Sequence, residues 1–354
     1  MSLRSFTEIR VTLLRVILNN VKNLVFKGNA LLKIGLVGCG YLGSRHLKHL
    51  LDIEGVEVSG VWDMDPATRK KANDEFDVQV AVDLEDLISR SDVVDIVTPT
   101  STHYEIGLQV IEAGLPLFVE KPICATYDEG LQMIEKARSA GVPIQVGHIE
   151  RFNRAFRALG SVKVRPGFIE AHRLAPWSPR GGDVAVVHDL MIHDLDLILT
   201  LADDFPVQIH ANGVGVVTDS VDIANVRLEF ASGLVANVTA SRISLKRMRK
   251  LRLFGDSEYI ALDLADGTCE YVGVTSDKSQ IPVGSQLIGA LGEGEMQRLL
   301  YRRFLPAEEG DALKLQLAAF RDAVIQDSAP QVTGEDGLNA LKLAESIVAQ
   351  IKER

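Results

Sequence analysis

The sequence has little of three features that define large classes of proteins. It contains only three cysteines among 354 residues, Cys39, Cys124 and Cys269, and no two of them form a CxxC pair. Neither a disulfide framework nor a zinc site is therefore predicted, and a reducing, cytoplasmic setting fits. No stretch reaches about 18 uninterrupted apolar residues, so no membrane-spanning helix is expected. Acidic residues outnumber basic ones, 48 to 38, and the net charge of −10 argues against nucleic acid as a partner.

Residues 1–30 carry apolar side chains at roughly helical spacing, interleaved with arginine and lysine. One interpretation is a basic amphipathic helix that lies on a membrane surface. The alternatives are an extension that packs on the protein or on another subunit, or a start codon placed too early. We favour these alternatives, and treat residues 1–30 as an N-terminal amphipathic extension without integral membrane association.

Residues 33–147 alternate short apolar strands with helices. Strands are expected at 34–37, 56–62, 93–97, 116–120 and 143–147, and helices at 41–51, 66–76, 84–89, 103–113 and 127–140. This alternation predicts an α/β Rossmann fold with a doubly wound parallel sheet. We assign the Rossmann domain to residues 31–150.

Residues 151–354 are predicted to have a different order of helices and strands. Helical segments at 152–159 and 187–201 precede strands at 223–230 and 234–241, which a hairpin turn joins, and a second strand pair at 250–254 and 259–264. The glycine-containing stretch 274–308 is predicted to be a long loop with short helices, and helices at 312–326 and 337–352 close the chain. We therefore expect a C-terminal α+β domain with a largely antiparallel open sheet over residues 151–354.

The first apolar strand runs into a GxGxxG sequence that opens a helix, the context that dinucleotide binding requires. The first glycine allows a tight turn, the second lets the backbone approach a pyrophosphate, and the third lets helix and strand pack closely. The start of the helix offers free N–H groups and the positive end of its dipole to phosphates. Cofactor binding is therefore favoured over a glycine-rich turn that binds nothing. The expected contacts are Gly38, Gly40, Tyr41, Leu42 and Gly43.

Asp63 ends the second strand, twenty residues after Gly43. A carboxylate there accepts hydrogen bonds from the adenosine ribose and repels a 2′-phosphate, so NAD is expected and NADP is disfavoured. Asp65 is an alternative ribose ligand, and Asp63 could instead cap the helix that begins at Pro66. Asp65, directly before Pro66, fits the cap better.

Two further polar segments follow apolar strands, TPTSTH at 98–103 and EKP at 120–122. Both come at the carboxyl ends of parallel strands, where open α/β sheets bind ligands. Together with the glycine loop, VGH at 146–148, RF at 151–152 and the Asp189-x3-His193-x2-Asp196 pattern, they resemble the glucose–fructose oxidoreductase/inositol dehydrogenase family (Gfo/Idh/MocA). The resemblance extends from about Lys33 to the C-terminus.

The resemblance implies hydride transfer between a nicotinamide cofactor and a hydroxyl carbon of a sugar or cyclitol. It implies a second α/β domain whose open sheet often makes dimer or tetramer contacts, so a homodimer or homotetramer is expected. It also implies a cis bond between Lys121 and Pro122. Further cofactor contacts are implied for Thr98, Pro99, Thr100, His103, Glu120 and Lys121, although many members carry Asn in place of Thr100.

Oxidation of a secondary alcohol needs a base for the hydroxyl proton and positive charge for the developing alkoxide. Lys121 can supply the charge, and His193 is suited to exchanging a proton near neutrality. Asp189 precedes His193 by four residues on a predicted helix, so it lies on the same face, where it can orient His193 and favour the imidazolium. A metal pair is the alternative, but a third ligand and an HExxH-type pattern are missing, so no metal is expected.

His148, Arg151 and Arg173 are candidates for binding a polar substrate, and an interdomain polar network explains them equally well. The basic run at 246–250 is either a solvated face or an attractant for an anionic substrate. The segments 146–153 and 189–196 resemble those of family members that oxidise the 3-hydroxyl of UDP-N-acetylglucosamine. We therefore expect an NAD-dependent dehydrogenase of a sugar or nucleotide sugar. The alternatives are a cyclitol or free-sugar dehydrogenase and a non-catalytic NAD-binding scaffold.

Overall fold

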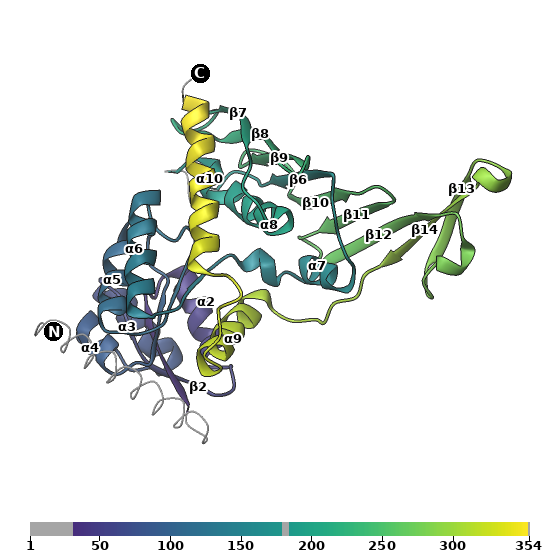
Figure 1. Cartoon of the computed structure of the whole chain (residues 1–354). Helices are drawn as coiled ribbons and strands as arrows, with labels where there is room; N and C mark the ends of the chain where they lie inside the picture. The colour runs from purple at the N-terminus through teal and green to yellow at the C-terminus, as the bar shows by residue number, and fades with distance from the viewer. Residues whose placement is uncertain (1–30, 179–183, 353–354) are drawn as a thin grey trace, which may run out of the picture. The chain divides into compact units, whose positions relative to one another are not determined.

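A computed structural model describes residues 31–178 and 184–352, and the predicted extension 1–30 lies outside these residues (Figure 1). The chain divides into two compact units. The first comprises the residues up to Glu120 together with Glu135–Gln145 and Leu317–Thr333. The second comprises Lys121–Ile134, Val146–Gln316 and the residues from Gly334 onward. Within the described residues no helix is long and apolar enough to cross a membrane.

The first unit is built on a five-stranded sheet with the strand order β2-β1-β3-β4-β5. The neighbours β1–β2, β1–β3 and β3–β4 pair in parallel, as predicted. The order reverses direction beside β1, and such a switch point is where doubly wound sheets bind ligands. The strands are β1 (Leu32–Val37), β2 (Val56–Trp62), β3 (Val93–Ile96), β4 (Leu117–Val119) and β5 (Ile144–Val146).

Helices cover this sheet, and its central strands are buried along their whole length. Every residue of β3 and β4 is buried, which is why these strands are almost entirely apolar in the sequence, with Asp95 of β3 as the exception. The ring of Phe118 in β4 packs against Phe320, with centroids 5.9 Å apart. The helices are α2 (Tyr41–Leu50), α3 (Pro66–Phe76), α4 (Leu84–Ser89), α5 (His103–Glu112), α6 (Tyr127–Ala140) and α9 (Ala312–Ile325), together with the 3₁₀ turn η1 (Thr100–Thr102). Helices α6 and α9 each contain residues of both units.

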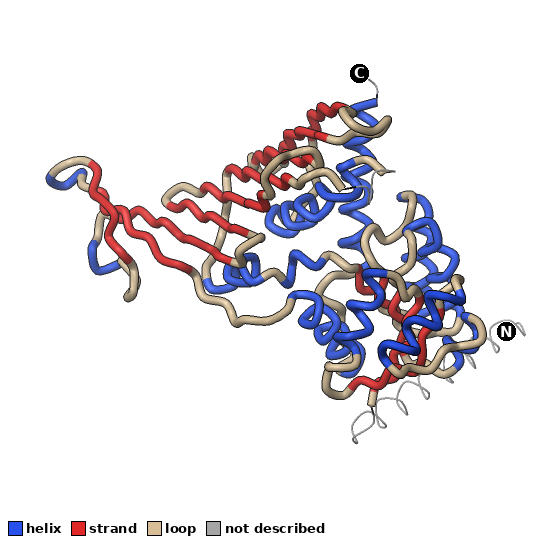
Figure 2. Tube along the Cα trace, turned by 180° about the vertical axis from the view of Figure 1, so that it is seen from behind, coloured by secondary structure: helices blue, strands red, loops and turns tan. Residues whose placement is uncertain are grey.

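The second unit contains a nine-stranded sheet with the order β13-β14-β12-β11-β10-β6-β9-β8-β7. Figure 2 shows its strands as one continuous ladder. All neighbouring strands of this sheet pair antiparallel except β6 and β9, so the predicted antiparallel sheet is confirmed with one parallel pair. The strands are β6 (Phe168–Leu174), β7 (Gln208–Val214), β8 (Ile223–Glu229), β9 (Val235–Ser241), β10 (Met248–Phe254), β11 (Glu258–Asp263), β12 (Thr268–Thr275), β13 (Gln286–Leu291) and β14 (Arg298–Phe304).

One face of this sheet carries the core of the second unit. Buried and partly exposed residues alternate along β6, β8 and β9, and the buried set packs against helices α8 (Ile192–Ala202) and α10 (Gly334–Lys352). The predicted helix at 187–201 begins with a π-helical turn, η4 (Val187–Met191). The helix predicted at 152–159 is shorter in the structure. It is α7 (Arg154–Arg157), which lies between the 3₁₀ turns η2 (Ile149–Phe152) and η3 (Ala158–Ser161). The remaining 3₁₀ turns are η5 (Lys278–Gln280) and η6 (Gly294–Met296).

The prediction of a long loop at 274–308 is wrong. This stretch contains β13 and β14, an antiparallel hairpin that continues the sheet beyond β12, away from α8 and α10 (Figure 1). Every residue of β13 is exposed, and the register shifts between Leu287 and Gly289. A strand with no buried face leaves no alternation in the sequence, because only burial imposes the two-residue period.

Candidate active site

The glycine loop joins β1 to α2, and its three glycines meet different demands. Gly38 has φ +91°, a conformation that favours glycine. A Cβ at Gly43 would lie 1.9 Å from the carbonyl oxygen of Gly38, so only glycine allows helix and loop to approach this closely. Gly40 is the N-cap of α2, and a Cβ there would meet nothing within 4 Å. The loop therefore has open space at Gly40, beside the N-terminus of α2, where a pyrophosphate fits.

Asp63 ties this loop to the end of β2. One carboxylate oxygen accepts a hydrogen bond from the N–H of Cys39 at 2.8 Å, and the other accepts from the N–H of Asp65 at 2.9 Å. A carboxylate has about four acceptor positions, so ribose hydroxyls can still bind. Asp65 is the N-cap of α3 and accepts from the N–H of Ala67 at 3.0 Å. The cap interpretation therefore holds for Asp65 and is wrong for Asp63.

The TPTSTH segment forms a turn that is closed by its own side chains. The hydroxyl of Thr102 donates to Thr98 Oγ1 at 2.8 Å, and His103 Nε2 lies 2.9 Å from the Thr98 carbonyl oxygen. His103 is fully buried, whereas Thr98 and Thr100 are partly exposed and Pro99 is exposed. The loop thus offers residues 98–100 to a ligand, while His103 holds the loop in place.

A buried histidine that the sequence analysis missed lies behind Glu120. His46 of α2 has Nδ1 2.9 Å from Asp95 Oδ2 and Nε2 3.2 Å from Glu120 Oε1. Burial alone would lower the pKa of His46, but the two carboxylates raise it to about 10, so the imidazolium bridges them. The aspartate inside the apolar run VVDIV was a visible signal, since a charge in a buried strand requires a partner.

In the second unit, Lys121 contacts the π-helical turn. Its ammonium group donates to the carbonyl oxygen of Asp189 at 2.8 Å and lies 3.8 Å from that residue's carboxylate. The bond between Lys121 and Pro122 is cis, as the resemblance implied. The structure thus brings together two of the three predicted catalytic residues.

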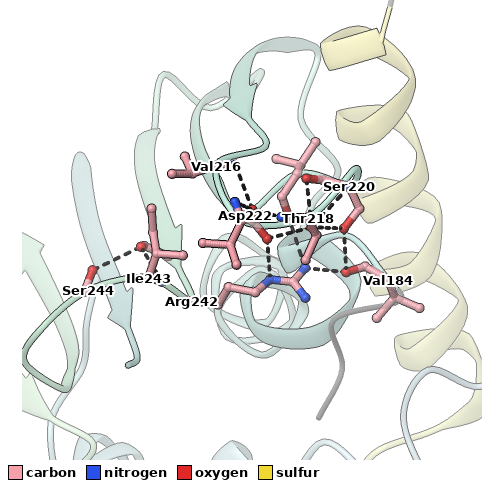
Figure 3. A network of polar contacts seen from close by, with 11 residues as sticks. Val184, Val216, Thr218, Ser220, Asp222, Arg242, Ile243 and Ser244 are labelled. Carbon is pink, nitrogen blue, oxygen red and sulfur yellow. Dashed lines mark hydrogen bonds and ion pairs between the residues drawn. The ribbon is translucent and has the colours of Figure 1, made fainter. Parts of the chain in front are cut away.

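A network of polar contacts anchors the chain that enters this turn (Figure 3). Asp222 Oδ2 accepts from the N–H groups of residues 216–218 at 2.7–2.9 Å, and Oδ1 accepts from the Thr218 hydroxyl at 2.8 Å. Burial would raise the pKa of Asp222, but these hydrogen bonds hold it well below its usual value. Arg242 lies 3.4 Å from Asp222 and donates to the carbonyl of Val184, three residues before η4 begins at Val187. The start of the turn that carries Asp189 is therefore fixed.

His193 lies on α8, four residues beyond Asp189, and its Nδ1 is buried without a hydrogen-bond partner among the described residues. Desolvation, followed by the charges of Lys121 and Arg173, places its pKa well below 6.5. The expectation that Asp189 favours the imidazolium is therefore wrong. The Asp189 carboxylate lies near Lys121, and cations dominate the surroundings of His193. A neutral imidazole with an unshared ring nitrogen can accept a proton.

Two arginines predicted to meet substrate are engaged in buried ion pairs within the second unit. Arg151 donates to both oxygens of Asp196, at 2.9 and 2.7 Å. Arg173 donates to both oxygens of Asp194, at 2.9 and 2.8 Å, and to Glu150 at 2.8 Å.

These contacts place Arg151 and Arg173 in a polar network, as the alternative explanation held, but the contacts described lie within the second unit and do not test an interdomain role. His148 is fully buried and is one of the groups that lower the pKa of His193. Among the described residues, no three His, Cys, Asp or Glu side chains are grouped to hold a metal ion.

Comparisons with known proteins show which family the chain resembles. Residues 32–148 match the sequence model of an oxidoreductase family with an NAD-binding Rossmann fold (GFO/IDH/MocA), and residues 159–261 match the model of the GFO/IDH/MocA C-terminal domain. The UDP-N-acetylglucosamine 3-dehydrogenase of Acidithiobacillus ferrooxidans is 34% identical over 238 residues, which cover 67% of this chain and 75% of the relative. The chain belongs to the GFO/IDH/MocA family of oxidoreductases.

Other members of the GFO/IDH/MocA family extend the comparison. The inositol 2-dehydrogenase of Burkholderia multivorans is 30% identical over 180 residues, which cover 47% of this chain and 53% of the relative. The solved structure of the A. ferrooxidans enzyme superposes with a TM-score of 0.80 at 28% identity, covering 91% of this chain and 98% of that one. The predicted family and fold class are confirmed, and the chain is an oxidoreductase with an NAD-binding Rossmann fold.

Proposed function

We propose that this chain is an NAD-dependent dehydrogenase of a nucleotide sugar, with the 3-hydroxyl of UDP-N-acetylglucosamine as the first candidate. The observation that carries the proposal is the buried Nδ1 of His193, which has no hydrogen-bond partner among the described residues, on the helix whose preceding turn accepts a hydrogen bond from Lys121 at 2.8 Å. The glycine loop, residues 98–100 and Asp63 would hold NAD, which when bound would supply the hydride acceptor for the carbinol carbon of the alcohol. His193 takes the hydroxyl proton on an imidazole nitrogen, and the Lys121 ammonium stabilises the alkoxide oxygen.

The remaining roles follow from the two domains assigned from the sequence. Residues 31–150 hold the cofactor, through the glycine loop and residues 98–100, and Asp63 selects NAD over NADP. Residues 151–354 provide the substrate site and the subunit contacts of a homodimer or homotetramer. The relative named UDP-N-acetylglucosamine 3-dehydrogenase supports the nucleotide sugar, and the inositol 2-dehydrogenases support a cyclitol as the second candidate.

The test follows NADH formation at 340 nm against a panel of UDP-sugars, free sugars and cyclitols. The Lys121→Ala and His193→Ala variants are expected to lose at least about a thousandfold in kcat, since each removes a group that acts in the transition state. Lys70→Ala, an exposed lysine on α3, is the matched control. NADH binding, measured by fluorescence, should survive in all three variants. Full turnover by His193→Ala would remove His193 from the base role.

A further inference from the structure

Two arginines face each other across neighbouring strands of the second unit. In the antiparallel pairing of β10 with β6, Arg249 is directly opposite Arg173. Side chains opposite each other on one face have Cβ atoms about 4.5–5.5 Å apart, and like charges there repel. A pair of this kind persists only where other charges compensate it.

The two arginines differ in how much nearby negative charge compensates their positive charge. Arg173 is 4% exposed and is matched by Asp194 and Glu150, each at 2.8 Å. Among the described residues Arg249 forms one ion pair, with Glu150 at 3.8 Å, while Asp194 adds a weaker attraction, and the Arg249 side chain is 49% exposed. Burial, followed by the charge of Arg173, lowers the pKa of the Arg249 guanidinium, and Arg247 adds further repulsion. Arg249 is therefore a cation held in place with too little negative charge around it.

Arg249 also belongs to the surroundings of the proposed base. It is one of the cations that lower the pKa of His193. Along β10 it shares a face with Leu251 and Leu253, which are buried in the core beside α8. Lys250 points to the opposite face and lies 3.3 Å from Asp263. The uncompensated charge is thus on the side of the sheet that carries His193.

We propose that Arg249, with Arg247 beside it, binds an anionic group of the substrate, and that this group is the diphosphate of a nucleotide sugar. The inference rests on the proposed function and makes it more specific. A guanidinium binds phosphate or carboxylate oxygens through two parallel N–H bonds, and here the ligand adds negative charge to that of Glu150 and Asp194. A carboxylate on the sugar ring has the same chemistry, so the experiment separates the two.

The kinetic test compares Arg249→Gln with Lys250→Gln, its neighbour on the opposite face. Arg249→Gln is expected to raise KM for UDP-N-acetylglucosamine at least about tenfold with kcat changed less than about threefold, because it removes binding that is the same in ground and transition states. Lys250→Gln should behave like the wild type. The acid limb of the kcat/KM profile should also move to higher pH in Arg249→Gln, since one cation near His193 is gone. An unchanged KM overturns the proposal.

A binding test separates this inference from the proposed reaction. UDP alone is titrated into the NADH-saturated enzyme in a calorimeter, and no turnover is needed. Binding to the wild type that weakens at least about tenfold in Arg249→Gln supports the anion site, even if no UDP-sugar is oxidised and the proposed function fails. Equal affinity in both overturns it. Arg249-dependent binding of glucuronate without binding of UDP overturns the diphosphate in favour of a carboxylate.

Discussion

Alanine at Gly40 and at Gly43, introduced one at a time, should separate cofactor binding from stability within one loop. A Cβ at Gly43 meets the backbone oxygen of Gly38 at 1.9 Å, an atom that no side-chain rotation can move away. Overpacking of this kind costs about 3 kcal/mol, and alanine's better helix propensity returns about 1 kcal/mol. A net loss of about 2 kcal/mol lowers Tm by roughly 4–8 °C.

Gly40→Ala should behave in the opposite way. Its Cβ meets nothing within 4 Å and its φ is −66°, so the added methyl group strains neither packing nor backbone. The methyl group instead occupies the space through which the pyrophosphate approaches the start of α2. We expect Kd for NADH to rise about 10- to 100-fold, equivalent to about 1.4–2.7 kcal/mol, with Tm lowered by less than about 3 °C.

The assays are fluorescence titration with NADH and differential scanning calorimetry of the cofactor-free protein. Wild-type NADH affinity in Gly40→Ala would refute the assignment of the cofactor to the start of α2. An unchanged Tm in Gly43→Ala would refute the close approach of Gly43 to Gly38.

Three further predictions concern charge. His46→Leu leaves Asp95 and Glu120 buried without their cation and should cost about 3–5 kcal/mol in urea unfolding. Because the folded pKa of about 10 exceeds the ordinary 6.5, the stability that His46 confers is complete below pH 6.5 and is lost as pH rises toward 10; wild-type stability should show that decline and the variant should not. The pKa of His193 is shifted in the opposite direction, downward, so this imidazole is neutral at pH 7. We therefore expect kcat/KM to fall only as the pH drops below 6.5. A fall of kcat/KM that begins above pH 6.5 would contradict the neutral state of His193. Asp63→Ala should relax the NAD-over-NADP preference at least about tenfold in the ratio of kcat/KM values, and an unchanged ratio would exclude Asp63 from ribose selection.

Features that depend on residues close in sequence were predictable. The glycine loop, the Asp65 cap and the β8–β9 hairpin each follow from the chemistry of a short segment, and the apolar runs of β3 and β4 revealed a sheet buried on both faces. The motifs of the family added the candidates Lys121 and His193, which no local pattern singles out as a pair.

Features that depend on distant partners were not predictable. His46 contacts Asp95 and Glu120 only because α2, β3 and β4 pack together, and no spacing in the sequence predicts these contacts. Arg173 looked available for substrate until its carboxylate partners were known. Strand β13 is exposed along its whole length, so the pattern that reveals other strands is missing there.

The π-helical turn at Val187–Met191 sets how this part of the enzyme can change during evolution. Each residue of an α-helix turns the chain by about 100°. A single deletion in the turn would let the helix close up as a regular one, and the segment before it would rotate by that angle relative to His193. The carbonyl oxygen of Asp189 would then leave Lys121, whereas substitutions that keep the length would leave that contact intact. We therefore expect selection on this segment to act on its length more strictly than on its composition.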